Sequence, residues 1–159
     1  MAIGTNAAVY FFGTEVNLST VATTAIVATT AISTAASLDE WANSDDAPLV
    51  SFVLEVDDWS GAPTAGETVD LYVRLMDTTG AGNDEPVHYA SYVPHYVGSF
   101  VVDAADAAQY LAIGPTGLPT YETSQNYAFT IVNNTSVTMG TGDNEWRIKV
   151  TPVTYGPHA

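Results

Sequence analysis

A two-residue period is clear in residues 49–59, which begin Leu49-Val50-Ser51-Phe52-Val53-Leu54-Glu55-Val56-Asp57 and end at Trp59. The even-numbered positions from 50 to 56 are all large and apolar, whereas the odd-numbered ones include Ser51, Glu55 and Asp57. Successive side chains of a β-strand point to opposite sides of the sheet, so this alternation predicts a strand with one buried and one wetter face. Such a strand is typical of an antiparallel sheet that covers a core on one side only.

The same period recurs along the chain. It is strong in residues 68–76, 126–133 and 145–153, and weaker in residues 96–103 and 109–113. Gly and Pro interrupt the chain often, and the loops at 60–67, 77–94 and 114–125 are the longest. This rhythm is typical of an all-β sandwich or barrel.

Two further segments complete the expected fold. The tetrapeptide TTAI occurs at 23–26 and again at 29–32, and this even offset places Ile26 and Ile32 on one face of a strand. Residues 19–34 are therefore expected to form one or two strands. Ser37-Leu38-Asp39-Glu40 resembles a capping box and predicts a short turn of helix.

The sequence as a whole predicts an antiparallel β-sandwich, jelly-roll-like, of seven to eight strands with an N-terminal arm. Its 159 residues are the size of one domain. We assign residues 1–17 to the arm and residues 18–159 to a single β-sandwich domain.

The charge of the chain is strongly one-sided. The chain contains eighteen Asp and Glu residues but only three basic residues, Arg74, Arg147 and Lys149, so the formal net charge is -15. Binding to nucleic acid or to an anionic membrane surface needs clustered basic residues, so neither is an expected partner. Self-repulsion of this kind is screened by salt, and we expect the melting temperature to rise with NaCl.

Two other classes of protein are also disfavoured. Because there is no cysteine, disulfide frameworks and thiolate metal sites are excluded. The uncharged run Val16–Leu38 is too rich in Thr and Ser for a membrane helix, and the N-terminus lacks the basic region of a secretory signal.

Motifs of catalysis are missing from the sequence, and we predict neither an enzyme nor a cofactor. There is no nucleophile elbow, phosphate loop, dinucleotide fingerprint or HExxH pair. His88 and His95, with Asp84 or Glu85 nearby, could form a metal or general-base site, but a surface loop with aromatic packing is the favoured interpretation. His158 lies in the tail.

Acidic pairs offer candidate calcium ligands. The best candidates are Asp57-Asp58 and Asp143-Asn144-Glu145, but no acidic pair has the spacing of an EF-hand loop. Solvated acidic loops are the favoured interpretation, so no metal ligand is predicted.

Two groups of apolar and aromatic residues are the candidate interface residues: Val9, Tyr10, Phe11 and Phe12 in the arm, and Tyr89, Tyr92 and Tyr96 farther along. The arm group falls outside any regular alternation, so it is either the first strand of the core or an anchor onto another protein. The three tyrosines could stack on sugar rings or pack within a sheet or an interface.

Three short stretches carry a resemblance to a known group of proteins: Pro63-Thr64-Ala65-Gly66-Glu67-Thr68-Val69-Asp70-Leu71-Tyr72, Tyr96-Val97-Gly98-Ser99-Phe100 and Tyr127-Ala128-Phe129-Thr130-Ile131-Val132-Asn133-Asn134-Thr135. The series resembles small virion structural proteins of tailed bacteriophages that look like jelly-roll or sandwich domains and serve as capsid decoration (cement) proteins. The resemblance covers roughly residues 48–152, and the first 45 residues carry no part of it.

The resemblance implies a non-enzymatic role and supplies no catalytic residues. It implies that the protein is made in the host cytoplasm and then binds the major capsid protein on the virion surface, often as a trimer. The alternative that we keep is a tail- or fibre-associated virion protein with a receptor- or glycan-binding face, on which the Tyr89–Tyr96 loop would be the working surface.

Overall fold

The computed structural model describes residues 8–19, 26, 38–78, 84–85, 95–142 and 144–157. These residues contain nine strands and no helix. The strands are β1 (Ala8–Phe12), β2 (Val16–Asn17), β3 (Trp41–Ala42), β4 (Leu49–Val56), β5 (Thr68–Met76), β6 (His95–Val101), β7 (Gln109–Thr116), β8 (Asn126–Asn133) and β9 (Trp146–Pro157).

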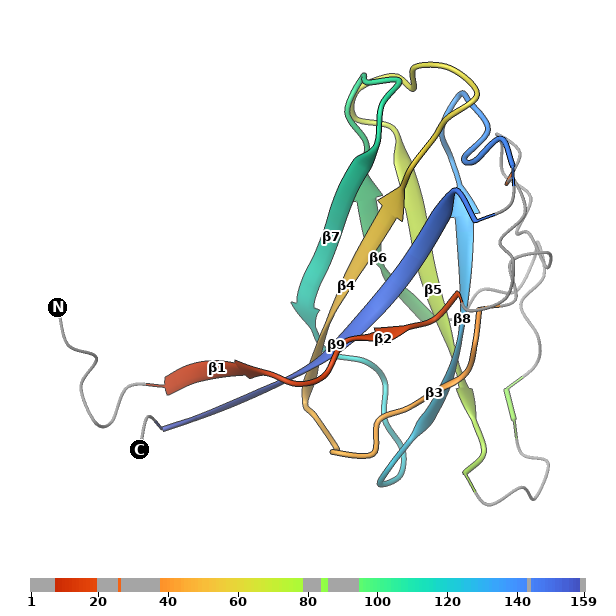
Figure 1. Ribbon diagram of the computed structural model, residues 1–159. Helices are drawn as coiled ribbons and strands as arrows, with labels where there is room; N and C mark the ends of the chain where they lie inside the picture. Colours follow the sequence, from red (N-terminus) through yellow and green to blue (C-terminus); the bar gives the residue numbers. More distant parts are fainter. Residues whose placement is uncertain are drawn as a thin grey trace, which may run out of the picture.

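The strands form two antiparallel sheets that face each other (Figure 1). One sheet has the order β1-β9-β4-β7, with β2 also paired to β9, and the other has the order β3-β8-β5-β6. The pairs β2–β9, β3–β8, β4–β7 and β5–β6 are nested, as if one long hairpin had been rolled up. This nesting is the jelly-roll topology, and the all-β sandwich predicted from the sequence is confirmed.

The described strands outnumber the expected seven to eight because β1 and β2 lie in the predicted arm and β3 follows the predicted helical turn, where no strand was expected. β1 and β2 are separated by an irregularity. Phe12 lies opposite Val153 and Val16 lies opposite Val150, so the chain gains one residue relative to β9 between β1 and β2. An extra residue of this kind is a β-bulge, which bends the strand that carries it. β1 and β2 therefore act as two halves of one edge strand.

The core lies between the two sheets and follows the alternation of the sequence. In β4 the side chains of Val50, Phe52, Leu54 and Val56 are at most 1% exposed. The ring of Phe52 meets that of Phe129 from the other sheet edge-on, with centroids 5.4 Å apart. Burial of such side chains is the main stabilising term of the fold.

Gly98 shows why the two sheets can approach closely at one edge. A Cβ at this position would lie 2.9 Å from Cγ2 of Ile113 on β7. The register of β6 on β5 also shifts at this point, between Leu71 and Tyr72. The absence of a side chain thus lets β6 and β7 pack against each other.

The sequence predicts one or two strands in residues 19–34 and a turn of helix after Ser37. The predicted turn of helix after Ser37 is wrong over its described residues, because Leu38–Glu40 form no helical turn and lead into β3. The backbone N–H of Asp39 donates to the carbonyl of Leu18 instead, at 2.6 Å. Of residues 20–37, only Ile26 is described: it is 4% exposed and bridges Met139, whereas Ile32 lies outside the described residues.

No helix long and apolar enough to cross a membrane occurs in the described part of the chain.

Candidate binding surface on the β1–β9 ribbon

A two-stranded ribbon projects from the sandwich and carries the candidate interface residues of the arm (Figure 1). It consists of β1 and the last part of β9, with Ala8 opposite Pro157 and Phe12 opposite Val153. β4 pairs with β9 only as far as Val153, which lies opposite Leu49. Residues 154–157 therefore pair with β1 alone.

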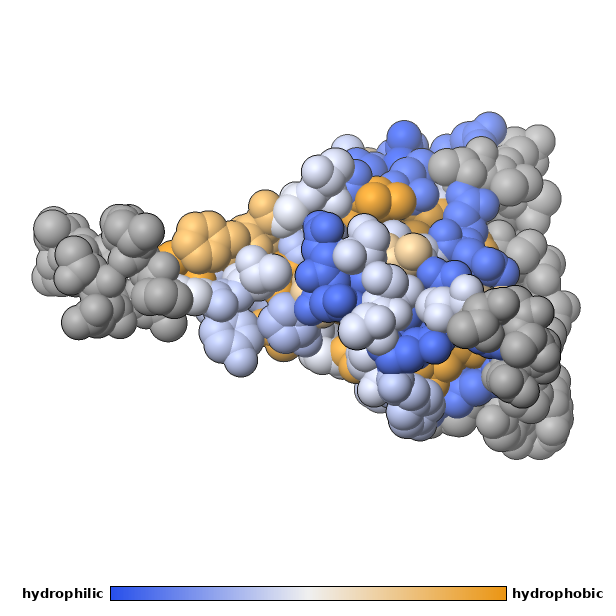
Figure 2. Space-filling model, turned by 90° about the horizontal axis from the view of Figure 1, so that it is seen from below, coloured by the Kyte–Doolittle hydropathy of each residue, from blue (hydrophilic) through white to orange (hydrophobic). Residues whose placement is uncertain are grey.

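The ribbon exposes large aromatic side chains. Tyr10 is 60% exposed, Phe11 51%, Phe12 64% and Tyr155 61%, while Val9 is partly buried. Figure 2 shows the ribbon as a narrow projection with hydrophobic side chains on its surface. Soluble monomers rarely expose contiguous apolar patches of this kind unless the patch meets a partner.

Both faces of the ribbon are apolar. Tyr10 lies opposite Tyr155, and because side chains alternate along a strand, Phe12 shares their face whereas Phe11 lies on the other. No residue of 8–14 or 150–157 is charged, although the whole chain carries a formal net charge of -15. The ribbon is thus an uncharged segment on an acidic protein.

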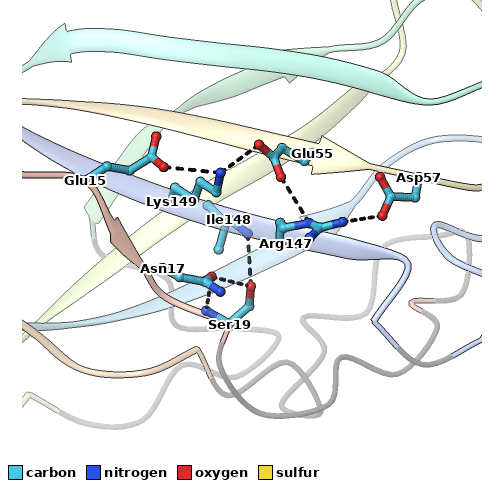
Figure 3. A network of polar contacts seen from close by, with 8 residues as sticks. All are labelled: Glu15, Asn17, Ser19, Glu55, Asp57, Arg147, Ile148 and Lys149. Carbon is cyan, nitrogen blue, oxygen red and sulfur yellow. Dashed lines mark hydrogen bonds and ion pairs between the residues drawn. The ribbon is translucent and has the colours of Figure 1, made fainter.

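A network of ion pairs fixes the base of the ribbon to the sandwich (Figure 3). Lys149 Nζ lies 3.2 Å from Glu15 Oε1 and 2.8 Å from Glu55 Oε1. Glu55 Oε2 also lies 3.0 Å from Nε of Arg147, and Arg147 forms a second ion pair with Asp57. The hydrogen bond from Lys149 to Glu55, followed by that to Glu15, raises the pKa of Lys149 above its usual value.

Residues 17–19 continue this attachment. Asn17 Oδ1 accepts hydrogen bonds from the backbone and the hydroxyl of Ser19, and the Ser19 hydroxyl accepts the backbone N–H of Ile148 at 3.1 Å. Leu18 is fully buried and its N–H donates to the carbonyl of Ile148. The last residues of the predicted arm, up to Asn17, are therefore built into the sandwich, and the projection ends near residue 13.

The second predicted group of interface residues is not brought to the ribbon. Tyr96 lies on β6 in the other sheet, is 57% exposed, and its ring is tilted against that of Tyr72 at 5.5 Å. Its hydroxyl meets that of Ser99 at 2.5 Å, and Ser99 donates to Asp70. Burial, and then the charge of Asp70, raises the pKa of Tyr72.

Tyr89 and Tyr92 lie outside the described residues, as do His88 and His158. His95 is described, and its Nε2 lies 2.8 Å from Glu85 Oε1. Glu85 Oε2 accepts the backbone N–H of Leu75, so this carboxylate holds the returning loop to the end of β5.

The described residues of the two candidate calcium sites bind other groups of the protein. Asp57 pairs with Arg147, and Asp58 accepts the hydroxyl of Thr141 at 2.7 Å. Glu145 accepts the backbone N–H groups of Thr141 and Gly142, which lowers its pKa. Asp143 is not described, and among the described residues no three His, Cys, Asp or Glu side chains gather in a way that could hold a metal ion.

A hollow at the end of β5 offers no clearer site. It has a volume of about 430 Å³ and lies between Met76, Glu85, Tyr121 and Glu122. Its carboxylates are already engaged, since Glu122 accepts the backbone N–H of Thr78 at 3.1 Å and Glu85 that of Leu75.

Sequence reasoning missed Tyr155 and the other ribbon residues of β9. The expected strand ended at Val153 because Pro152, Gly156 and Pro157 interrupt the two-residue period. One feature of the sequence could have indicated that these segments pair: residues 150–157 and residues 8–14 both lack charged side chains.

Comparisons of the chain with protein-family models, with curated proteins and with solved structures each return no match.

Proposed function

We propose that the protein is a structural virion protein of a tailed bacteriophage, a decoration (cement) protein that binds the major capsid protein and stabilises the capsid. The observation that carries the proposal is the ribbon, which presents four aromatic side chains, each more than half exposed, on an uncharged projection. Aromatic side chains dominate the binding energy of protein interfaces because each buries a large area at low entropic cost. Phe12, Tyr10 and Tyr155 would bind between neighbouring capsid subunits.

Two features of the sandwich favour a role in adhesion. The carboxylates of Asp57, Asp58 and Glu145 are held by hydrogen bonds and an ion pair within the protein, which suits a structural role. The ion-pair network around Lys149 also ties the ribbon to the sandwich at its base, so that force applied at the ribbon would reach the whole domain. A ligand that binds only the intact shell raises the stability of that shell by mass action.

The test is co-sedimentation with shells assembled from the major capsid protein encoded in the same genome. The double variant Tyr10→Ser with Phe12→Ser should lose at least tenfold in affinity, since two large apolar contacts are removed. A matched control, Tyr110→Ser with Tyr121→Ser, removes two side chains that are 70% and 77% exposed elsewhere. The control should bind as the unchanged protein does, and full occupancy by the ribbon variant would refute the proposal.

Point substitutions are sharper than deletion of residues 1–17 for this purpose. That deletion also removes Glu15 and β2, and it cuts the chain directly before the buried Leu18. A loss of binding after deletion could then come from damage to the sandwich.

A second candidate is a tail- or fibre-associated protein with a glycan-binding face. Exposed Tyr96, tilted against Tyr72 with Asp70 and Ser99 alongside, combines an aromatic surface with hydrogen-bonding groups, which suits a sugar ring. Binding on a glycan array that Tyr96→Ala abolishes and Tyr110→Ala preserves would favour this candidate. Absence of any glycan binding by the unchanged protein would exclude it.

A further inference from the structure

The ribbon has an open edge whose backbone groups can be assigned. β1 is the last strand on its side of the sheet, and among the described residues no strand pairs with its outer edge. The N–H of Gly13 donates to the carbonyl of Pro152, which places Gly13 in a hydrogen-bonded pair with β9. Because such pairs alternate along an antiparallel ladder, Val9 and Phe11 also bond to β9, whereas the N–H and C=O groups of Tyr10 and Phe12 point outward.

This edge lacks the usual protections against pairing. Edge strands are normally short, or carry charged residues or proline on the edge, because their free backbone groups attract other strands. β1 is five residues long and reads Ala8-Val9-Tyr10-Phe11-Phe12, with neither charge nor proline. A two-stranded ribbon is also marginally stable by itself in water.

The opposite edge of the ribbon is a poorer place for pairing. Pairing between β4 and β9 stops at Val153. Beyond it, only Tyr155 has a backbone N–H that points away from β1, because Pro157 has no N–H. The edge of β1 is therefore the one that a further strand would use.

We propose that a second copy of this chain pairs antiparallel with the open edge of β1, so that two ribbons join into one continuous sheet across a two-fold axis. An antiparallel pair centred on Tyr10 is self-complementary. Tyr10 lies opposite Tyr10 of the second copy, and the outward N–H and C=O groups of both β1 strands form hydrogen bonds with each other. The proposal does not depend on the capsid role, since edge pairing uses the backbone and leaves the aromatic faces available.

Charge favours pairing at this edge over direct contact between two sandwiches. Contact between two sandwiches would bring two formal charges of -15 together. Antiparallel pairing of the ribbons places the sandwiches at opposite ends of β1, which spans about 17 Å for its five residues. This distance exceeds the screening length of about 8 Å at physiological salt.

Analytical ultracentrifugation of the full chain tests the proposal. We expect a reversible monomer–dimer equilibrium, with a dissociation constant that falls at least threefold as NaCl rises from about 50 to about 500 mM, because salt screens the remaining repulsion. A monomer at every concentration and salt level, or a trimer, would overturn the proposal.

Paired substitutions at one residue separate backbone pairing from side-chain contact. Tyr10→Pro removes the outward N–H, which β9 does not use, whereas Tyr10→Ala removes the ring and keeps the N–H. Proline should weaken the dimer at least tenfold more than alanine does, with the same midpoint of urea unfolding in both variants as the check of folding. Equal effects of the two substitutions would contradict strand pairing.

Amide exchange measured by NMR gives an independent readout on the unchanged protein. The amides of Tyr10 and Phe12 should become more protected as protein concentration rises, while that of Phe11 is protected at every concentration by β9. Concentration-independent exchange at Tyr10 and Phe12 would refute the proposal even if a dimer forms.

Discussion

The two parts of β9 show how one strand can serve two purposes. From Trp146 to Val153 the strand lies beside β4 and above the second sheet, and its residues Ile148 and Val150 are fully buried. From Thr154 to Pro157 it pairs with β1 alone, and Tyr155 is 61% exposed. Backbone pairing continues through both parts, so the presence of a facing sheet is what makes one part core and the other surface. We therefore expect substitutions in the sandwich to change stability and those in the ribbon to change association.

The largest difference should appear between two phenylalanines. Phe52→Ala removes a fully buried ring that contacts Phe129, and it should lower the free energy of unfolding by about 3–5 kcal/mol. Phe12→Ala removes a ring that is 64% exposed and should change this free energy by less than about 0.5 kcal/mol. Urea denaturation of both variants measures the two effects. A large loss at Phe12 would mean that the ribbon belongs to the core.

A smaller effect is expected where the sheets approach at Gly98. Gly98→Ala places a Cβ against Ile113 and should cost about 1–3 kcal/mol through overpacking. Combining it with Ile113→Ala should recover part of this loss relative to the sum of the single changes, because the clash is removed. Additive losses in this double-mutant cycle would show that the two side chains do not limit each other.

The ion pairs at the base of the ribbon should contribute less still. Glu55→Gln removes the carboxylate that Lys149 and Arg147 share, and since both cations are partly exposed we expect a loss of about 1 kcal/mol. Thermal melts at low and high NaCl measure the effect, which should shrink as salt screens the pairs. A loss that is unchanged by salt would indicate that Glu55 acts by packing.

The smallest effect concerns acid stability. Glu67 accepts the backbone N–H groups of Ser136 and Thr64, which lowers its pKa below the usual 4.5. A lowered pKa means that Glu67 stabilises the fold above pH 4.5 and that this contribution is lost as pH falls through the folded-state value. Glu67→Gln should therefore lower stability at neutral pH and flatten the acid limb of a stability–pH curve measured in urea. An acid limb identical to that of the unchanged protein would contradict this role.

The sandwich was largely predictable because its strands obey a local rule. β5 and β8 have the expected bounds, Thr68–Met76 and Asn126–Asn133, since strict alternation is flanked by turn residues. β7 runs on to Thr116, beyond the expected residue 113, where Gly114 and Pro115 concealed the strand. The expected helical turn at 37–40 failed over its described residues because a distant carbonyl, that of Leu18, provides a partner for Asp39.

The candidate site was predictable only in part. Tyr10, Phe11 and Phe12 stood out as a run of aromatic residues without alternation, and they lie exposed on the ribbon. The role of Tyr155 depends on the register between β1 and β9, which no local pattern reveals. Whether these residues bind another protein stays a prediction.

Both ends of the described chain lie at the tip of the ribbon, and this position matters for protein engineering. Ala8 and Pro157 lie opposite each other at the far end of the ribbon, so cargo joined directly to either residue would lie beside the aromatic residues (Figure 1). The turn between β6 and β7, with exposed Asp103, Ala104 and Asp106, lies at the other end of the sandwich. An insertion there would leave the ribbon unobstructed and is the rational position for a label or a displayed peptide.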